Sequence, residues 1–280
     1  MARIRVVTDS ACDLSAALAE ECGVTVVPLS IRFGSEEFVD GSTLSTDEFW
    51  ARCAASPVLP ETSAPSPGAF HEAFAAAADD GYDGVLCLNL SAGVSATYQA
   101  AVTAAKSFGD RIPVRVIDTR SMTMGLGLIV LDVAELAATG ADLDQLADHA
   151  VALIPRIKVF GVVDTLEHLE KGGRIGGARA LLGSLLSIKP VVTLVDGVVE
   201  EESKQRTRAR SLTYLADKAK ESPPIGRLAV CNGAATDIDA FVAMLDGVQT
   251  EHPLVVADLG PVVGTHTGPG TIGLCILTSG

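Results

Sequence analysis

The sequence lacks the patterns by which most nucleotide-dependent and metal-dependent enzymes are recognised. It contains no GxxxxGK[ST] phosphate-binding loop, no glycine-rich dinucleotide fingerprint after its first apolar run and no HExxH zinc motif. Its six cysteines form no CxxC pair, which argues against a zinc site or a thioredoxin-like redox site. We therefore expect neither a cofactor nor a metal ion.

Long apolar runs are also missing. The longest, near Gly125–Val130, ends before Asp132 and falls far short of the roughly 18 residues of a membrane span. The N-terminal residues have no apolar region of the kind found in signal peptides. Cys87 and Cys275 lie inside apolar segments, as buried thiols do in a reducing compartment. These features predict a cytoplasmic protein without a membrane span.

Positive charge is scarce except in one segment. The chain has 21 Lys and Arg against 35 Asp and Glu, a net charge of −14, which disfavours binding to nucleic-acid phosphates. The segment from Arg156 to Arg210 differs, with ten basic and seven acidic residues. This positive island would suit a small anion or an acidic partner. Ordinary scatter of surface charge is the alternative.

Short apolar runs alternate along the chain with stretches of helical periodicity. This alternation predicts an α/β fold with mainly parallel sheets flanked by helices. We expect two α/β domains, residues 1–155 and 156–280, that meet at Pro155. One expected helix follows the glycine cluster at 172–177 and runs through Leu185. The expected strands are Ile4–Thr8, Val24–Ile31, Gly84–Asn89, Val114–Asp118, Val159–Val163, Ile188–Val195, Leu228–Cys231, Leu254–Ala257 and Ile272–Leu277.

Three polar turns are the first candidates for a site. Thr8-Asp9-Ser10 follows a strand, where open α/β sheets place ligands, although Ser10 could merely cap a helix. The loop at 62–66 offers three hydroxyls before a helix, as an anion site or as a simple N-cap. Ser95 lies in a segment one glycine short of a GxSxG nucleophile elbow. A serine hydrolase with Ser95 as nucleophile and His266 as base is therefore an alternative, although no orienting acid is evident.

Three further segments combine glycine or positive charge with a turn. Arg174 lies inside the glycine cluster 172–177, which predicts either an anion-binding nest or a hinge. Arg206 belongs to the basic run 204–210, which also fits a solvated helix start. His266 precedes a Gly-Pro-Gly turn, and a lone histidine is more often structural than functional. None of these signals is specific alone.

Taken in order, the motifs resemble those of the DegV family over essentially the whole chain. The sequence departs from the family pattern at Ala96, where glycine is usual, and at Ala64, where glutamine is common. Neither departure removes a hydroxyl. The segments that carry the resemblance are Thr8-Asp9-Ser10, Thr62-Ser63-x-Pro65-Ser66, Ser95-x-Thr97-Tyr98-Gln99, Gly172-Gly173-Arg174, Ile188-Lys189-Pro190, Arg206-Thr207 and His266-x-Gly268-Pro269-Gly270.

The resemblance implies a non-catalytic protein that holds a long-chain fatty acid, such as palmitate, in a buried tunnel between two domains. Its carboxylate would be held by Thr62 and Ser95. The resemblance also implies an ATP-dependent fatty acid kinase as partner, with Arg174, Arg206 and His266 as a rim for that partner or for a phosphoryl group. Transient membrane contact would allow lipid exchange. A regulatory or scaffold protein whose lipid is purely structural is a third possibility.

Overall fold

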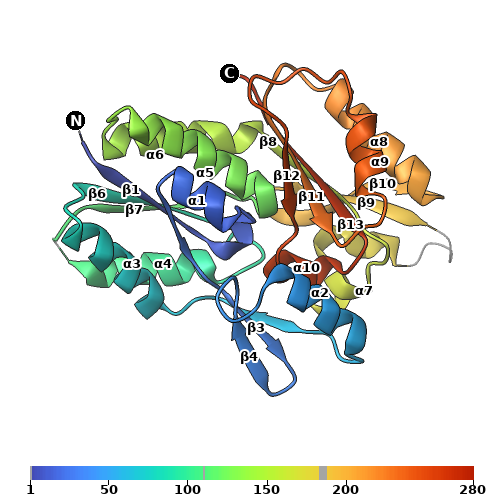
Figure 1. Cartoon of the computed structure of the whole chain (residues 1–280), viewed down its shortest axis with the longest axis horizontal. Coiled ribbons are helices and arrows are strands. Elements are labelled where there is room, and N and C mark those ends of the chain that lie inside the picture. Colours follow the sequence, from blue (N-terminus) through green and yellow to red (C-terminus); the bar gives the residue numbers. More distant parts are fainter. Residues whose placement is uncertain (1, 110, 183–187) are drawn as a thin grey trace.

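The computed structural model describes residues 2–109, 111–182 and 188–280, and their strands form three sheets (Figure 1). The first sheet has the order β2-β1-β6-β7, and every neighbouring pair in it is parallel. Its strands are β1 (Ile4–Asp9), β2 (Val24–Val27), β6 (Gly84–Asn89) and β7 (Val114–Asp118). The parallel α/β arrangement expected from the alternating pattern is confirmed here.

The second sheet has six strands in the order β10-β9-β8-β13-β11-β12. Here the expectation of mainly parallel pairing does not hold, because only β11 and β12 are parallel. One physical reason is the tight turn at Asp196-Gly197, whose positive φ angles of 49° and 82° favour a two-residue hairpin. The strands are β8 (Ile157–Val162), β9 (Lys189–Val195), β10 (Val198–Gln205), β11 (Ile225–Gly233), β12 (Val255–Asp258) and β13 (Thr271–Thr278).

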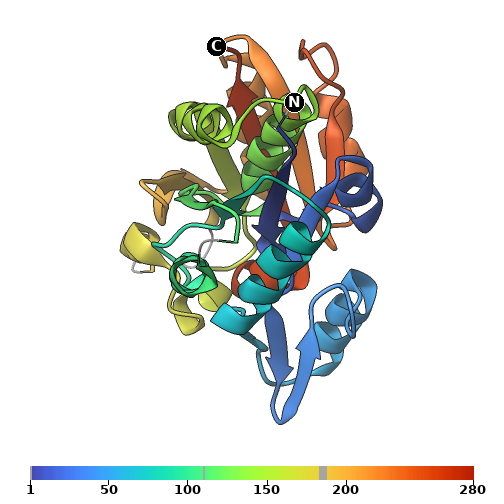
Figure 2. The same cartoon turned by 90° about the vertical axis from the view of Figure 1, so that its left-hand side faces the viewer.

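A small third sheet projects from the body of the molecule (Figures 1 and 2). It pairs β3 (Ser30–Phe33) with β4 (Glu36–Val39) and β5 (Glu61–Ser63), all antiparallel. The single strand expected over 24–31 is therefore two strands, interrupted at Pro28, which has no N–H for a sheet ladder. Thr62, expected in a loop, lies on β5 opposite Ile31.

Side-chain caps define several helix starts. Ser45 and Ser66 accept hydrogen bonds from backbone N–H groups three residues on, and Asp142 forms a full capping box with Gln145. The α-helices are α1 (Ala16–Glu21), α2 (Thr46–Ala55), α3 (Pro67–Asp79), α4 (Thr97–Phe108), α5 (Thr123–Ala138), α6 (Leu143–Leu153), α7 (Glu167–Lys171), α8 (Arg208–Lys220), α9 (Ile238–Met244) and α10 (Pro261–Thr267). Short 3₁₀ segments are η1 (Ser10–Cys12), η2 (Ile154–Arg156) and η3 (Gly176–Leu181); the rest of the helix expected through Leu185 falls outside the described residues.

Helix α5 lies in the core that the first and second sheets share. Eleven of its sixteen residues are buried, and it packs against strands of both sheets. The inner faces of both sheets contribute to this core, through residues such as Leu86 on β6 and Ala229 on β11. The outer face of the first sheet packs under α3 and α4, and that of the second under α8 and α9.

The proposed division at Pro155 falls in η2, between α6 and β8. The strands of the first and third sheets precede it, and all six strands of the second sheet follow it. We keep this residue as the proposed boundary. Within the described ranges, no helix combines the length and apolar character needed to cross a bilayer.

Candidate functional site

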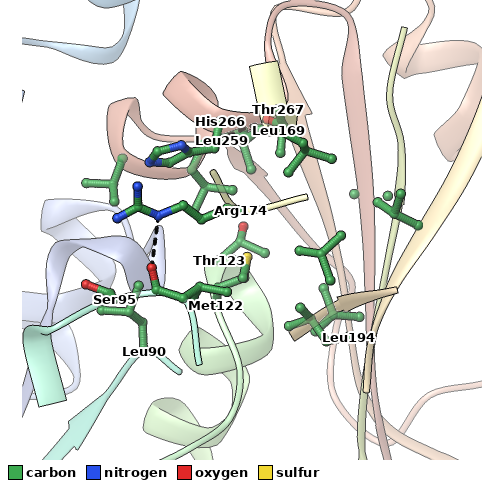
Figure 3. Close-up of a pocket in the computed structure, with 18 of the residues that line it drawn as sticks. Leu90, Ser95, Met122, Thr123, Leu169, Arg174, Leu194, Leu259, His266 and Thr267 are labelled. Carbon is green, nitrogen blue, oxygen red and sulfur yellow. Dashed lines mark hydrogen bonds between the residues drawn. The ribbon is translucent and has the colours of Figure 1, made fainter. Parts of the chain in front are cut away.

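A cavity of about 170 Å³ lies between the first and second sheets (Figure 3). The loop after β6 and the start of α5 form one side, and the inner faces of β8 and β9 form another, with α7 and α10 completing the lining. Most of the lining is aliphatic, including Leu90, Met122, Val159, Leu194 and Val262. The chain thus encloses a largely apolar space at the carboxyl end of a parallel strand, where α/β sheets commonly bind ligands.

Four polar side chains gather at one end of the cavity: Thr62, Ser95, Arg174 and His266. The Thr62 hydroxyl and His266 Nε2 are hydrogen-bonded at 2.9 Å. Ser95 Oγ lies 2.9 Å from the hydroxyl of Thr97 and accepts the Thr97 backbone N–H at 3.2 Å. We call these four side chains the polar end of the cavity.

Arg174 is held in place by backbone carbonyls. Its Nε donates to the carbonyl of Val94 at 3.1 Å, the dashed line in Figure 3, and its Nη1 donates to that of Gly172 at 2.6 Å. These bonds use two of the five N–H groups of a guanidinium. The cation is therefore fixed beside Ser95 and His266 with donors left for an anion.

His266 is a neutral histidine at physiological pH. Burial, reinforced by the positive charge of Arg174 and by His168, lowers the pKa of its imidazole to about 4. Its Nδ1 is buried without a hydrogen-bond partner among the described residues. This nitrogen lies against Gly172, so the N–H donors left for a ligand at this end of the cavity are those of Arg174.

Glycines allow the histidines to approach the backbone closely. A Cβ on Gly172 would lie 2.3 Å from His266 Nδ1, and a Cβ on Gly268 would lie 2.6 Å from the ring of His168. Helices α7 and α10 thus each place a histidine over the glycine that follows the other helix. The glycine cluster after α7 is explained by this close packing, and Gly176 likewise lies against Val199.

The other hydroxyls that line the cavity are satisfied within the protein. Thr123 donates to a carboxylate oxygen of Asp13 at 2.5 Å, and Thr193 to the carbonyl of Val159 at 2.9 Å. Thr267 and Thr271 donate to backbone carbonyls of the α10 region. These four threonines have their hydroxyls already engaged, so the free polar groups of the lining are concentrated at the polar end.

The five residues singled out from sequence do not all meet. Thr62, Ser95, Arg174 and His266 line the cavity together, although they come from segments up to 204 residues apart. Arg206 is exposed just after β10 and is not part of the lining. In the same basic run, Arg208 pairs with Asp237 and Asp164, so part of that run is structural.

The arrangement does not support the hydrolase alternative. His266 Nε2 bonds to Thr62 rather than to Ser95, and Ser95 bonds within its own turn to Thr97. In the described part of the chain, no carboxylate hydrogen-bonds to His266. The base and the orienting acid that a serine nucleophile requires are therefore not assembled here.

The Thr8-Asp9-Ser10 turn is structural. Asp9 is fully buried and accepts hydrogen bonds from the backbone of Ala11 and Leu90 and from the side chain of Asn89. Ser10 Oγ accepts the backbone N–H of Leu29. Burial raises the pKa of Asp9 to about 6 despite these hydrogen bonds.

Sequence reasoning missed the apolar lining and His168. Val159 and Leu194 lie on apolar strands with consecutive buried residues, so nothing distinguished a residue facing a cavity from one facing the core. His168 could have been noticed from its proximity to the glycine cluster four residues later.

The chain resembles known proteins in both sequence and structure. The family model described as "Uncharacterised protein, DegV family" matches residues 3–279. A DegV domain-containing protein of Streptomyces coelicolor is 37% identical over 280 residues, covering 98% of both chains. A DegV domain-containing protein of Deinococcus radiodurans is 36% identical over 279 residues, again covering 98% of both.

Solved structures show the same fold. A DegV family protein from Thermus thermophilus, described by its fatty acid binding, superposes with a TM-score of 0.89 at 33% identity, covering 99% of this chain and 100% of that one. DegV from Bacillus subtilis, described as a fatty acid binding protein, gives 0.86 at 27% identity, with 100% of both chains covered. A stearic acid-binding protein from Eubacterium ventriosum gives 0.85 at 27% identity, covering 99% and 98%.

Proposed function

We propose that this chain, which belongs to the DegV family, binds one long-chain fatty acid in the cavity between its sheets. The carboxylate lies at the polar end, and the acyl chain runs along the aliphatic lining. One observation carries the proposal: the Arg174 guanidinium, which has donors to spare, and two hydroxyls lie at a single end of an otherwise apolar cavity. The fatty acids bound by the solved relatives support the same ligand class.

The acyl chain supplies most of the affinity. Each buried methylene contributes roughly 0.8 kcal/mol, so about 15 of them contribute up to about 12 kcal/mol before the cost of association. Hydrogen bonds to a charged group are worth roughly 1.5–3 kcal/mol each. The polar end therefore decides which end of the ligand faces outward more than it decides whether the ligand binds.

The polar end offers donors to a carboxylate. When the proton of neutral His266 is on Nε2, the ring donates to Thr62, and the Thr62 hydroxyl then donates to the ligand. Ser95 supplies a second hydroxyl, and Arg174 supplies positive charge with three unused N–H groups. The ligand carboxylate is thus oriented by neutral hydroxyls beside one fixed cation.

Removal of the two hydroxyls tests the site. In a Thr62→Val, Ser95→Ala double variant we expect folding to persist while fatty-acid affinity falls at least tenfold, about 1.4 kcal/mol. Thr193→Val is the matched control, because its hydroxyl lines the cavity but donates to Val159. The measurement is lipid extraction and native mass spectrometry of purified protein, followed by titration of delipidated protein. Unchanged affinity in the double variant would remove both residues from the head-group site.

The second part of the proposal is presentation of the carboxylate to an ATP-dependent kinase, which would form an acyl phosphate and ADP. Thr62, Arg174 and His266 also line an outer pocket of about 550 Å³, together with His168 and Lys171. The carboxylate would thus lie one layer of side chains from an outer surface that carries Arg174 and Lys171, with Glu61 beside them. The hydroxyl donors occupy only part of the lone pairs of the carboxylate, so one of its oxygens stays available to attack a phosphoryl donor.

Arg206 tests presentation separately from binding, because it is exposed and outside the lining. Arg206→Ala should keep its fatty acid while acyl-phosphate formation with ATP and a cognate kinase falls at least tenfold. The control is Arg111→Ala, which removes an exposed arginine near α3, remote from the second sheet. Equal activity of the two variants would make Arg206 incidental, and parallel loss of lipid would place it in binding.

A further inference from the structure

The end of the cavity opposite the polar end is formed by Val159 and Leu194. These two residues line the cavity and also line an outer cleft of about 770 Å³ on the other side. Figure 3 shows Leu194 across the cavity from Ser95 and His266. The pair therefore lies between the cavity and this outer cleft, and we call it the end wall.

The sheet register places the two side chains of the end wall together. Strands β8 and β9 are antiparallel, with Phe160 opposite Thr193 and Gly161 opposite Val192. The next position along the same ladder brings Val159 opposite Leu194. The Thr193 hydroxyl donates to the carbonyl of Val159 at 2.9 Å and ties the strands at this point.

The two residues differ in how firmly they are held. Val159 is buried, and a Cβ on Gly125 of α5 would lie 2.3 Å from its Cγ2, so its side chain packs directly on that helix. Leu194 is only half-buried and lies next to Val195, which is exposed. Leu194 is thus the end-wall residue that can be removed with least damage to the core.

The cleft behind the end wall could accommodate hydrocarbon. Part of its lining is apolar, with Ile154, Pro155 and Ile157, and the side chains of Val151 and Val195 are 55% and 49% exposed there, while the charged residues Asp118, Arg120 and Asp196 also line the cleft. An acyl chain that passed the end wall would therefore meet apolar surface rather than bulk water alone.

We propose that Val159 and Leu194 set the upper limit on acyl chain length, because the methyl end of the ligand abuts them. This inference rests on the proposed fatty-acid binding and adds the residues that select among fatty acids. A wall that stops the chain makes each methylene beyond the limit unfavourable. Without the wall, each further methylene that finds apolar contact raises affinity about fourfold.

The test is a titration of delipidated protein with myristic, palmitic, stearic, arachidic and behenic acids. For Leu194→Ala we expect the affinity for arachidic relative to palmitic acid to rise at least about tenfold over wild type, as two or more methylenes gain contact. Val195→Ala is the matched control, because Val195 lies next to Leu194 but lines only the outer cleft and not the cavity. That control should leave the chain-length preference unchanged.

A variant in the opposite direction keeps the inference testable if Leu194→Ala folds poorly. A Cβ on Gly161 would meet only Val192 Cγ2, at an ordinary 3.5 Å, so Gly161→Ala should fold and shorten the preferred chain. Unchanged length preference in both variants, or an equal shift in Val195→Ala, overturns the end wall. Wild-type protein that binds none of the five acids would instead overturn the proposed function itself.

Discussion

Two clusters of buried polar side chains differ in how far the protein itself satisfies their hydrogen bonds. One lies around Asp9, and the other is the polar end of the cavity. Both oxygens of Asp9 accept hydrogen bonds, one from Ala11 and the other from Asn89 and Leu90. At the polar end, His266 Nδ1 has no partner among the described residues, and Arg174 has donors to spare. The satisfied Asp9 carboxylate holds the turn after β1 in place, whereas Arg174 at the polar end retains donors for a ligand.

Burial shifts the pKa values of Asp9 and His266 in opposite directions. It raises the pKa of Asp9 to about 6 and lowers that of His266 to about 4, because it disfavours the charged form of each. Acidification therefore stabilises the fold through Asp9 and destabilises it through His266. Variants that separate these effects test the comparison.

The largest effect is expected from Asp9→Ala. The substitution leaves two backbone N–H groups and the Asn89 amide without an acceptor in a buried site, which should lower the free energy of unfolding by about 3–5 kcal/mol. Denaturant unfolding measures it. Asp9→Asn, which keeps one acceptor, should lose less. A loss below about 1 kcal/mol would show that the cluster is not structural.

Gly172→Ala should come next. Its Cβ would lie 2.3 Å from His266 Nδ1, so the ring must move, and we expect a stability loss of about 1–3 kcal/mol with at least tenfold weaker fatty-acid binding. Thermal unfolding and lipid titration measure the two effects. Gly68→Ala is the control, since its Cβ would make only an ordinary contact with Ser66 and alanine favours the helix. Full lipid affinity in Gly172→Ala would separate the ring position from binding.

A smaller, pH-dependent effect is expected from His266→Asn. The unfolded histidine binds a proton near pH 6.5, whereas the folded one does so only near pH 4, so wild type loses stability as pH falls through this window. Between pH 7.5 and pH 5 the unfolding free energy of wild type should fall by about 2 kcal/mol relative to the variant. Asp9 is common to both proteins and cancels in the difference. Parallel pH curves would mean that His266 titrates normally.

The smallest effect is expected from Arg206→Ala. The side chain is exposed, so the unfolding free energy should change by less than about 0.5 kcal/mol. Arg208→Ala, two residues on, removes ion pairs with Asp237 and Asp164 and should cost more. Chemical denaturation of the two variants measures their free energies of unfolding for this comparison. A larger loss for Arg206 would assign it a structural role.

The sequence allowed the elements with a strong local signal to be predicted. The buried strand Gly84–Asn89 and the cap at Ser66 are where their patterns placed them. Strand β10 was missed because its half-exposed residues Glu200–Lys204 read as a solvated segment. The antiparallel pairing of the second sheet was missed as well, since alternation of burial does not encode strand direction.

The site was predictable only where side-chain chemistry is distinctive. Hydroxyl and charged residues such as Thr62 and Arg174 stand out in turns, and the structure brings them to one cavity. The hydrogen bonding of each group was not predictable. Within the residues that the structure describes, His266 Nδ1 has no partner because it packs against Gly172, which is distant in sequence. Nothing in the sequence marked Leu194, because its proposed role depends on its position between the cavity and the outer cleft.

The burial of helix α5 determines how fast its amide protons exchange with solvent. Because the core it occupies is shared by the first and second sheets, its amide protons can reach solvent only when that core opens, and their hydrogen exchange should be limited by global unfolding. Global unfolding is too rare to be the route by which a ligand enters. For the proposed fatty acid, exchange would then proceed by local fluctuations at the two ends of the cavity, around the α7–α10 histidines or the end wall, while α5 stays packed.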